Sequence, residues 1–353
     1  MPDFLRSIAF ATAVLLATGA CAETRIGLAA PLEGPLALLG EQMRVGAQLA
    51  AKEAGAILVP VDDQCSAEGG AAAARKLLAE RVSLVVGFLC TEAIEAALPI
   101  LAKEDVPTIT SGVRADSLTE RREKTGWLVW RVAPRADAEA GAAAQILTRR
   151  WRDRLFAIVD DGTIYGRDLS ETVRLAVETA GLKPVFVDTF RPQSENQIAL
   201  VGRLRRAGAA EIFVGGDRED IAIIARDAAS LENDLTIIGG EALKATGEIP
   251  IEPGVMMVGL PEPVVSANET VRKLFAEQGV EPEGYALPSY VAVEIALDAI
   301  GRTNSSSISL ADALSQARIE TAIGVVTFDD RGDLAENPYR LLRYDGTRFL
   351  PVE

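Results

Sequence analysis

The chain contains no histidine among its 353 residues. That absence excludes Ser-His-Asp and Cys-His catalysis, removes the commonest zinc ligand, and takes away the side chain that ordinarily titrates near neutral pH. Any catalysis would have to use carboxylates, lysine or tyrosine, and these residues form no recognisable catalytic constellation. We therefore expect a protein that is not an enzyme, and we predict neither a metal nor a cofactor.

Positive charge is also scarce. Lysine and arginine together number 36 against 51 acidic residues, which gives a formal net charge of −15, and no basic cluster is present. An acidic chain of this kind is not attracted to nucleic acids or to anionic membrane surfaces. We expect a soluble monomer whose partners include no nucleic acid.

The N-terminus has the composition of an export signal. Arg6 precedes an uncharged stretch from Ser7 to Thr18, and Ala20-Cys21-Ala22 has small residues at the spacing of a signal peptidase site. The stretch is too short to span a bilayer. We predict a signal peptide over residues 1–22 and a mature chain exported to the periplasm. Acylation of Cys21 as a lipoprotein is the alternative that stays open.

Cysteine is rare, and its positions are informative. The chain has three cysteines, so removal of Cys21 with the signal leaves Cys65 and Cys90. Each of these two ends an apolar run typical of a buried parallel strand, and a helical pattern follows each one. Disulfides persist in an oxidising compartment. We predict a Cys65 to Cys90 disulfide, with two buried free thiols as the alternative.

Short apolar runs alternate with amphipathic helical patterns along most of the chain. Strands are predicted at Thr24–Ala29, Ile57–Val61, Leu84–Val86, Thr108–Ile109, Trp127–Val132, Leu155–Val159, Val185–Phe190, Ile212–Val214, Thr236–Ile238 and Gly254–Val258. Helices are predicted at Gly40–Ala54, Ala67–Glu80, Thr91–Lys103, Asp137–Trp151, Tyr165–Ala180, Asn196–Ala207 and Glu219–Leu231. This alternation predicts an α/β protein with two lobes, each built on a doubly wound parallel sheet.

Two further segments suggest how the lobes are joined. Leu260-Pro261-Glu262-Pro263 reads as a second crossing between the lobes, and Asp329 to Asp333 as a third. We predict a first lobe of residues 23–134 with 264–327. The second lobe would then comprise residues 135–263 with 328–353, and a hinge of three segments would join the two.

Several segments together resemble one protein family. They are Thr24 to Pro35, Asp62 to Cys65, Gly87 to Thr91, Asp160 to Gly166, Gly239 to Glu241 and Ile323 to Asp329. In order and spacing they resemble the type I periplasmic binding proteins, above all the branched-chain amino-acid (Leu/Ile/Val) binding family of ABC transporters. The resemblance covers essentially the whole mature chain. It implies a clamshell that binds an amino acid between its lobes and delivers it to a membrane permease.

The resemblance also implies which residues hold the ligand on the first lobe. The ligand carboxylate would be bound at Cys90 and Thr91, and by the loop that contains Gly112 and Arg114. Independently of the family, a helix that starts at Thr91 would offer unpaired N–H groups and a partial positive charge to an anion. A plain N-cap is the alternative role for Thr91.

On the second lobe, the resemblance places Glu241 where the family binds the ligand ammonium, and Tyr165 where a ring covers the ligand. Asp217 would assist Glu241. A solvated loop position for Glu241 and simple helix packing for Tyr165 are the alternatives.

Three departures from the family pattern bear on the ligand. Arg114 replaces a threonine, Leu39 replaces an aromatic residue and Asp217 replaces a tyrosine. Arg114 would either bind a carboxylate through two hydrogen bonds or pair with Asp217 or Asp116. These changes favour a ligand more polar than leucine. We expect the solute-binding component of an ABC importer for a small amino acid or related polar carboxylate. The alternative is a ligand-sensing subunit for amides, urea or aromatic and organic acids.

Overall fold

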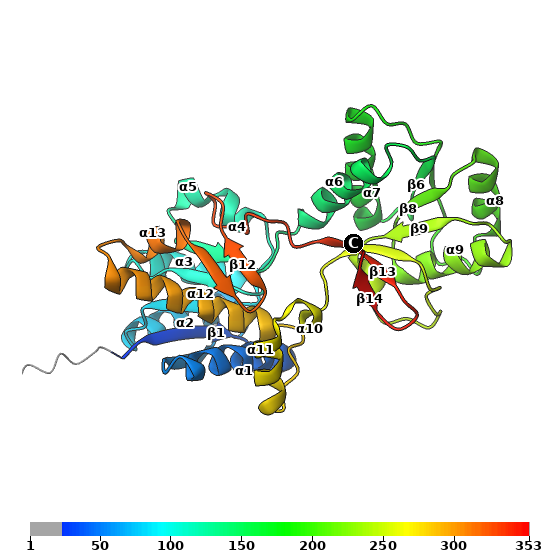
Figure 1. The fold of residues 1–353 in the computed structure, drawn as a ribbon. Coiled ribbons are helices and arrows are strands. Elements are labelled where there is room, and N and C mark those ends of the chain that lie inside the picture. Colours follow the sequence, from blue (N-terminus) through cyan, green and yellow to red (C-terminus); the bar gives the residue numbers. More distant parts are fainter. Residues whose placement is uncertain (1–22, 353) are drawn as a thin grey trace, which may run out of the picture.

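The computed structural model describes residues 23–352, which form two lobes (Figure 1). Each lobe is a sheet covered by helices on both faces, so the predicted α/β fold with two doubly wound lobes is confirmed. The predicted signal peptide lies outside the described residues. Among the residues described, no helix is long and apolar enough to cross a membrane.

The sheet of the first lobe has five parallel strands in the order β2-β1-β3-β4-β5. Their bounds are β1 (Arg25–Ala30), β2 (Ile57–Asp62), β3 (Leu84–Gly87), β4 (Thr108–Thr110) and β5 (Val129–Arg131). The strand β3 consists of Leu-Val-Val-Gly and is buried along its whole length. Such uninterrupted apolar strands need helices on both faces.

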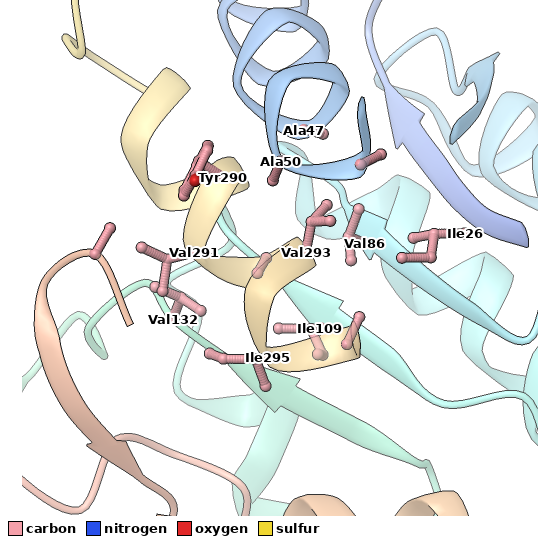
Figure 2. Close-up of a cluster of buried hydrophobic side chains, with 14 of the residues drawn as sticks. Ile26, Ala47, Ala50, Val86, Ile109, Val132, Tyr290, Val291, Val293 and Ile295 are labelled. Carbon is pink, nitrogen blue, oxygen red and sulfur yellow. The ribbon is translucent and has the colours of Figure 1, made fainter. Parts of the chain in front are cut away.

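Helices α1 (Ala37–Glu53) and α12 (Ala286–Ser305) cover one face of this sheet, and α2 (Ala67–Ala79) and α3 (Thr91–Ala102) cover the other. Figure 2 shows Val293 of α12 beside Val86 of the sheet, Ile295 beside Ile109, and Val291 beside Val132. The remaining elements of this lobe are η1 (Gly34–Leu36), α4 (Ser117–Glu120), α5 (Arg122–Thr125), α10 (Pro263–Ser266), α11 (Glu269–Glu277), α13 (Leu310–Ser315), β11 (Arg318–Thr321) and β12 (Gly324–Thr327).

The sheet of the second lobe is mixed and has seven strands in the order β14-β13-β10-β9-β8-β6-β7. The parallel strands are β6 (Phe156–Asp160), β7 (Phe186–Thr189), β8 (Glu211–Gly215), β9 (Thr236–Gly239) and β10 (Met256–Gly259). Two antiparallel strands, β13 (Arg340–Tyr344) and β14 (Phe349–Pro351), extend one edge of the sheet. The sequence patterns predicted the parallel part and missed this edge.

Helices α6 (Ala138–Arg150) and α7 (Ile164–Thr179) pack on one face of the second sheet, and α8 (Ile198–Ala207) and α9 (Arg218–Ser230) on the other. A short helix, η2 (Glu241–Lys244), follows β9 directly. Side-chain caps fix the starts of α7 and α9. At α7, for example, the Thr163 hydroxyl accepts a hydrogen bond from the Gly166 N–H at 3.0 Å, which caps the helix.

Three segments of the described chain pass between the lobes: after β5, between β10 and α10, and before β13 (Figure 1). The third passes between the lobes later than the segment predicted at Asp329 to Asp333. Phe328 belongs to the core of the first lobe, and Asp333 pairs with the buried Arg131 at 2.5 Å. Contacts of the first lobe therefore extend past the predicted boundary at Thr327, to Asp333.

Candidate functional site

The carboxyl end of β3 leads directly into a helix N-terminus. Helix α3 begins at Thr91, and Cys90 occupies the N-cap position without a side-chain cap. The first N–H groups of a helix have no partner within the helix, and the helix dipole adds a partial positive charge there. Thr91 is half-buried and does not occupy the N-cap position that the simpler alternative gave it. The position suits an anion.

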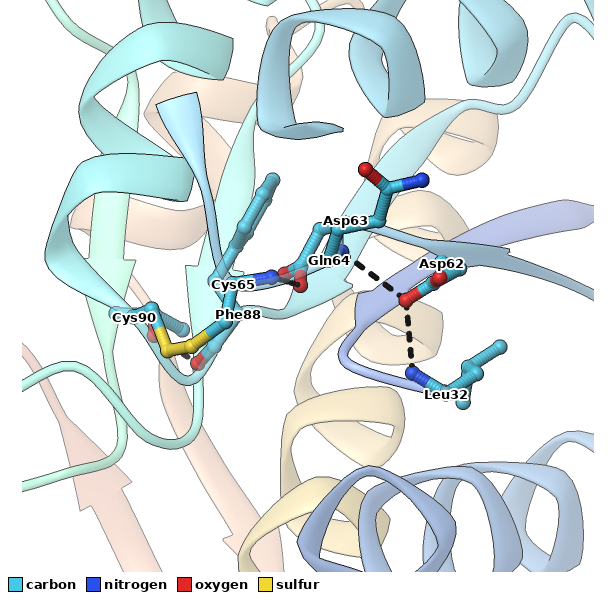
Figure 3. Close-up of a disulfide and its surroundings, with 8 residues drawn as sticks. Leu32, Asp62, Asp63, Gln64, Cys65, Phe88 and Cys90 are labelled. Carbon is cyan, nitrogen blue, oxygen red and sulfur yellow. Dashed lines mark hydrogen bonds between the residues drawn. A yellow bond between two sulfur atoms is a disulfide. The ribbon is translucent and has the colours of Figure 1, made fainter. Parts of the chain in front are cut away.

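A disulfide fastens this helix start to the neighbouring strand end (Figure 3). Cys65, just after β2, is bonded to Cys90, with 5.2 Å between the two Cα atoms, which confirms the predicted bridge. The preceding carboxylates shape the loop: Asp63 accepts a hydrogen bond from the Cys65 N–H at 2.9 Å, and Asp62 accepts one from the Leu32 N–H at 2.9 Å. The loops after β1, β2 and β3 are thus held together.

The loop after β4 lies against the same corner. The Thr110 hydroxyl donates to the Phe88 carbonyl at 3.2 Å and accepts from the Val113 N–H at 3.1 Å. Gly112 is buried between these residues, and a Cβ there would lie 2.8 Å from the Phe88 carbonyl oxygen. Glycine is therefore required for the close approach of two loops. Two residues further on, the Arg114 side chain leaves this corner toward the second lobe.

Arg114 makes the principal contact between the lobes at this site. Its guanidinium lies 3.5 Å from the Glu241 carboxylate and also donates to the Tyr339 hydroxyl. The Tyr339 hydroxyl donates to the same Glu241 oxygen, Oε2, at 2.7 Å. Lys244 contacts the other oxygen, Oε1, at 3.3 Å. The structure therefore brings together, from opposite lobes, two residues that were each predicted to bind the ligand.

The alternative partners predicted for Arg114 are wrong. Asp116 instead lies 3.6 Å from Arg135, and Asp217 is an exposed residue that caps α9 by accepting a hydrogen bond from the Asp220 N–H at 3.0 Å. An aspartate that follows a strand and precedes a helix commonly caps that helix, so the Asp217 carboxylate is already engaged by a backbone N–H group of α9. A ligand contact by Asp217 stays a prediction.

Glu241 is a partly buried anion with several donors around it. Burial alone would raise its pKa, but the Tyr339 hydroxyl, Lys244 and Arg114 outweigh burial and hold the pKa of Glu241 below its ordinary value. Burial and the neighbouring carboxylate raise the pKa of the Tyr339 hydroxyl, which keeps it a donor. Glu241 is therefore ionised throughout the neutral pH range.

A second carboxylate, that of Glu139 in the first turn of α6, binds the backbone of Glu241 and holds it in place. Its Oε1 accepts hydrogen bonds from the Tyr165 hydroxyl at 2.9 Å and from the Glu241 N–H at 2.6 Å. Glu139 is only 8% exposed, and burial raises its pKa. Gly240 permits this packing, because a Cβ there would collide with Glu139 and with the Tyr165 hydroxyl. Tyr165 thus shares Glu139 with the backbone of Glu241, and the ligand contact that the resemblance implied for its ring stays a prediction.

Sequence reasoning missed Glu139, Lys244 and Tyr339. An acidic residue in a first helical turn, as at Glu139, ordinarily indicates only a favourable interaction with the helix dipole. Tyr339 follows the third segment between the lobes, far along the chain from its partners. The one available signal was at Lys244, a cation three residues after a predicted ligand-binding carboxylate.

Two hollows on the second lobe lie elsewhere. One, of about 540 Å³, is lined by α8 residues and Leu231, and the other, of about 260 Å³, by residues of α7 and β7 among others. Neither is lined by Arg114 or Glu241. We therefore define the candidate site by the side chains that face each other across the two lobes.

Comparisons with known proteins agree with this architecture. The family model described as periplasmic binding protein matches residues 23–348. The Leu/Ile/Val-binding protein homolog 3 of Brucella melitensis is 27% identical over 99% of both chains. The leucine-, isoleucine-, valine-, threonine- and alanine-binding protein of Pseudomonas aeruginosa is 27% identical over 92% of this chain and 91% of its own length.

Solved structures share the fold at lower identity. An ABC transporter substrate-binding protein from Sphaerobacter thermophilus superimposes with a TM-score of 0.67 at 19% identity, covering 94% of this chain and 97% of that one. A second, from Desulfitobacterium hafniense in complex with Leu, gives a TM-score of 0.64 at 20% identity over 94% and 100% of the chains.

Proposed function

Because this chain belongs to the periplasmic binding protein family, we propose that it is the solute-binding component of an ABC importer. It captures a small amino acid or a related polar carboxylate between its lobes and delivers the ligand to a membrane permease. The names of its relatives, which bind leucine, isoleucine and valine among other amino acids, support this proposal. They do not favour a sensing subunit for amides, urea or aromatic acids.

The contact that carries the proposal is the one between Arg114 and Glu241, 3.5 Å apart on opposite lobes. A zwitterion presents one carboxylate and one ammonium, so it can replace this pair by binding each partner separately. The ligand carboxylate takes Arg114 and the N-terminus of α3 at Thr91, and the ammonium takes Glu241. Both ligand charges are then paired when water is removed, which burial of a charge requires.

Ligand binding of this kind links the lobes. Thr91 and Arg114 belong to the first lobe, and Glu241 with Tyr165 belongs to the second. A ligand that touches both sets interacts more strongly with a closed arrangement than with an open one, so its binding energy favours closure. A closed, monomeric, periplasmic complex is what a permease would recognise.

A thermal shift screen of the mature chain, residues 23–353, tests the proposal. An amino acid that binds should raise the Tm, and at equal concentration a tighter-binding one should raise it more, because a ligand that binds only the folded state stabilises it. Mass spectrometry of the ligand after incubation should show it unchanged. If no amino acid or carboxylate shifts the Tm, or if the ligand is converted, the proposed function is wrong.

A further inference from the structure

The site between the lobes carries more positive charge than a neutral amino acid needs. Glu241 is the carboxylate that faces Arg114, and both of its oxygens are occupied: Oε2 by Arg114 and Tyr339, and Oε1 by Lys244. One anion is therefore shared by two cations, one from each lobe. The family resemblance from which the site was predicted assigned no role to Lys244.

The two cations are also the more accessible groups. The side chains of Arg114 and Lys244 are 38% and 33% exposed, against 20% for Glu241. Glu139 lies behind Glu241, and its Oε1 is already occupied by two donors from the second lobe. A ligand that enters between the lobes therefore meets two positive groups before it meets the carboxylate.

The nearby arginine does not change this balance. Arg135, in the first segment between the lobes, is already surrounded by the carboxylates of Asp116, Glu120, Asp137 and Asp333. These four carboxylates balance the charge of Arg135. The positive charge that lacks an anion of its own is therefore that of the second of the two cations that share Glu241.

Closure around a neutral zwitterion would leave one of these cations without an anion. The ligand ammonium would occupy Glu241, its carboxylate would satisfy Arg114 and the start of α3, and Lys244 would lose its partner. An unpaired charge removed from water is costly, whereas a ligand with a second acid group supplies the missing anion.

We infer that the ligand is an amino acid with an acidic side chain, and that Lys244, together with Arg114, binds its second acid group. This inference rests on the proposed function and names the ligand class for the same site. The ligand α-carboxylate lies at the N-terminus of α3 and Arg114, its ammonium lies at Glu241, and its side-chain acid lies between Arg114 and Lys244, so that Arg114 contacts both acid groups.

Isothermal titration calorimetry with matched ligands tests the inference. Glutamate and glutamine, and aspartate and asparagine, have the same shape and differ in the side-chain charge. The acid should bind at least about tenfold more tightly than its amide, because one paired charge distinguishes them, and tenfold corresponds to about 1.4 kcal/mol. Equal or tighter binding of glutamine, asparagine or leucine would overturn the inference and leave the proposed function standing.

Lys244→Gln then tests the residue. The variant should lose most of the preference for acid over amide, measured as the ratio of the two dissociation constants. Lys273→Gln is the matched control, because Lys273 pairs with Glu269 on the exposed face of α11, with side chains 70% and 72% exposed. An unchanged preference in Lys244→Gln would show that this lysine only forms a surface pair with Glu241. If no amino acid binds the wild type, the proposed function itself fails.

Discussion

Arg131 on β5 is a fully buried charge outside the site. Its side chain is 0% exposed, and its guanidinium pairs with Asp333, 5% exposed, at 2.5 Å. The Thr119 hydroxyl contacts both Asp333 oxygens, at 3.0 and 2.9 Å, and Arg131 also donates to the Ala115 carbonyl. This cluster fixes the segment after β12 to the first lobe, next to the third segment between the lobes.

Replacing Arg131 by methionine should therefore lower the free energy of unfolding by about 3 kcal/mol, since it removes the buried partner of the Asp333 carboxylate and leaves Arg135, 3.4 Å away, as the remaining cation. Urea denaturation followed by circular dichroism measures the change. Arg25→Met is the control: Arg25 pairs with Glu80 at 2.8 Å, but the side chains are 31% and 45% exposed, so the loss should be below about 1 kcal/mol. Equal losses in the two variants would contradict this account.

Glu294 on α12 is a second residue whose burial can be measured, through the pH dependence of stability. Its carboxylate accepts a hydrogen bond from the Ala322 N–H at 2.8 Å, yet burial raises its pKa from 4.5 to about 7. The folded state therefore holds this proton more tightly than the unfolded chain. Its contribution to stability is complete below pH 4.5 and is lost as the pH rises through about 7.

Glu294→Gln should remove this part of the pH dependence. Stability of the wild type, followed by urea denaturation at a series of pH values, should fall more steeply over the interval from 4.5 to about 7 than stability of the variant. Asp63 and Asp220, whose pKa values burial raises to about 6, contribute in the same direction in both proteins. Glu320→Gln, at an exposed position on β11, should keep the wild-type slope. A wild-type slope in Glu294→Gln would refute the assignment.

At the scale of elements, the packing of α1 against α12 depends on a glycine. A Cβ at Gly46 of α1 would collide with the Ala286 carbonyl at the start of α12. Gly46→Ala should therefore lower the free energy of unfolding by about 1 to 3 kcal/mol, because backbone cannot move aside as a side chain can. Chemical denaturation of the two proteins measures the difference.

Gly141 of α6 provides the matched comparison. It is also helical, but a Cβ there would meet nothing within 4 Å. Gly141→Ala should raise the free energy of unfolding by up to about 1 kcal/mol, since alanine loses less backbone entropy in a helix. A stabilising Gly46→Ala would show that the two helices are not held at the distance that the structure gives.

The parallel strands and their helices were predictable because their patterns are local. A run such as Leu84–Gly87, buried throughout, reads as a strand between two helical patterns without knowledge of the fold. Helix α12 gave a weaker signal because most of its surface is buried, so it lacks the polar face that marks a helix. The strands β13 and β14 are short, edge-forming and partly exposed, and their pairing depends on a distant part of the chain.

The candidate site was predictable only in part, because several of its contacts join residues that are distant in the sequence. Thr91 and Glu241 stand at strand ends, where local patterns and the family resemblance both direct attention. The contact of Arg114 with Tyr339 joins residues 225 positions apart in the sequence, and Glu139 reaches Glu241 through tertiary packing alone. No periodicity or spacing encodes such contacts. Which of these side chains touches the ligand stays a prediction.

At the scale of the whole molecule, the proposed ligand would link the two lobes. In the structure, Arg114 of the first lobe reaches Glu241 and Tyr339 of the second. A bound amino acid would take over this contact and pair with both lobes at once. The central claim is that Glu241 binds the ligand ammonium while the first lobe binds the carboxylate.

Calorimetry on Glu241→Gln, with the tightest-binding amino acid from the thermal shift screen, tests that claim most directly. Affinity should fall by about 2 to 4 kcal/mol, roughly 30-fold to 1000-fold, because a buried ammonium loses its charged partner. The ligand-free Tm of the variant reports separately on folding, and Glu269→Gln on the exposed face of α11 should bind as the wild type does. Wild-type affinity in a folded Glu241→Gln would contradict the account, since the ammonium would then lie elsewhere.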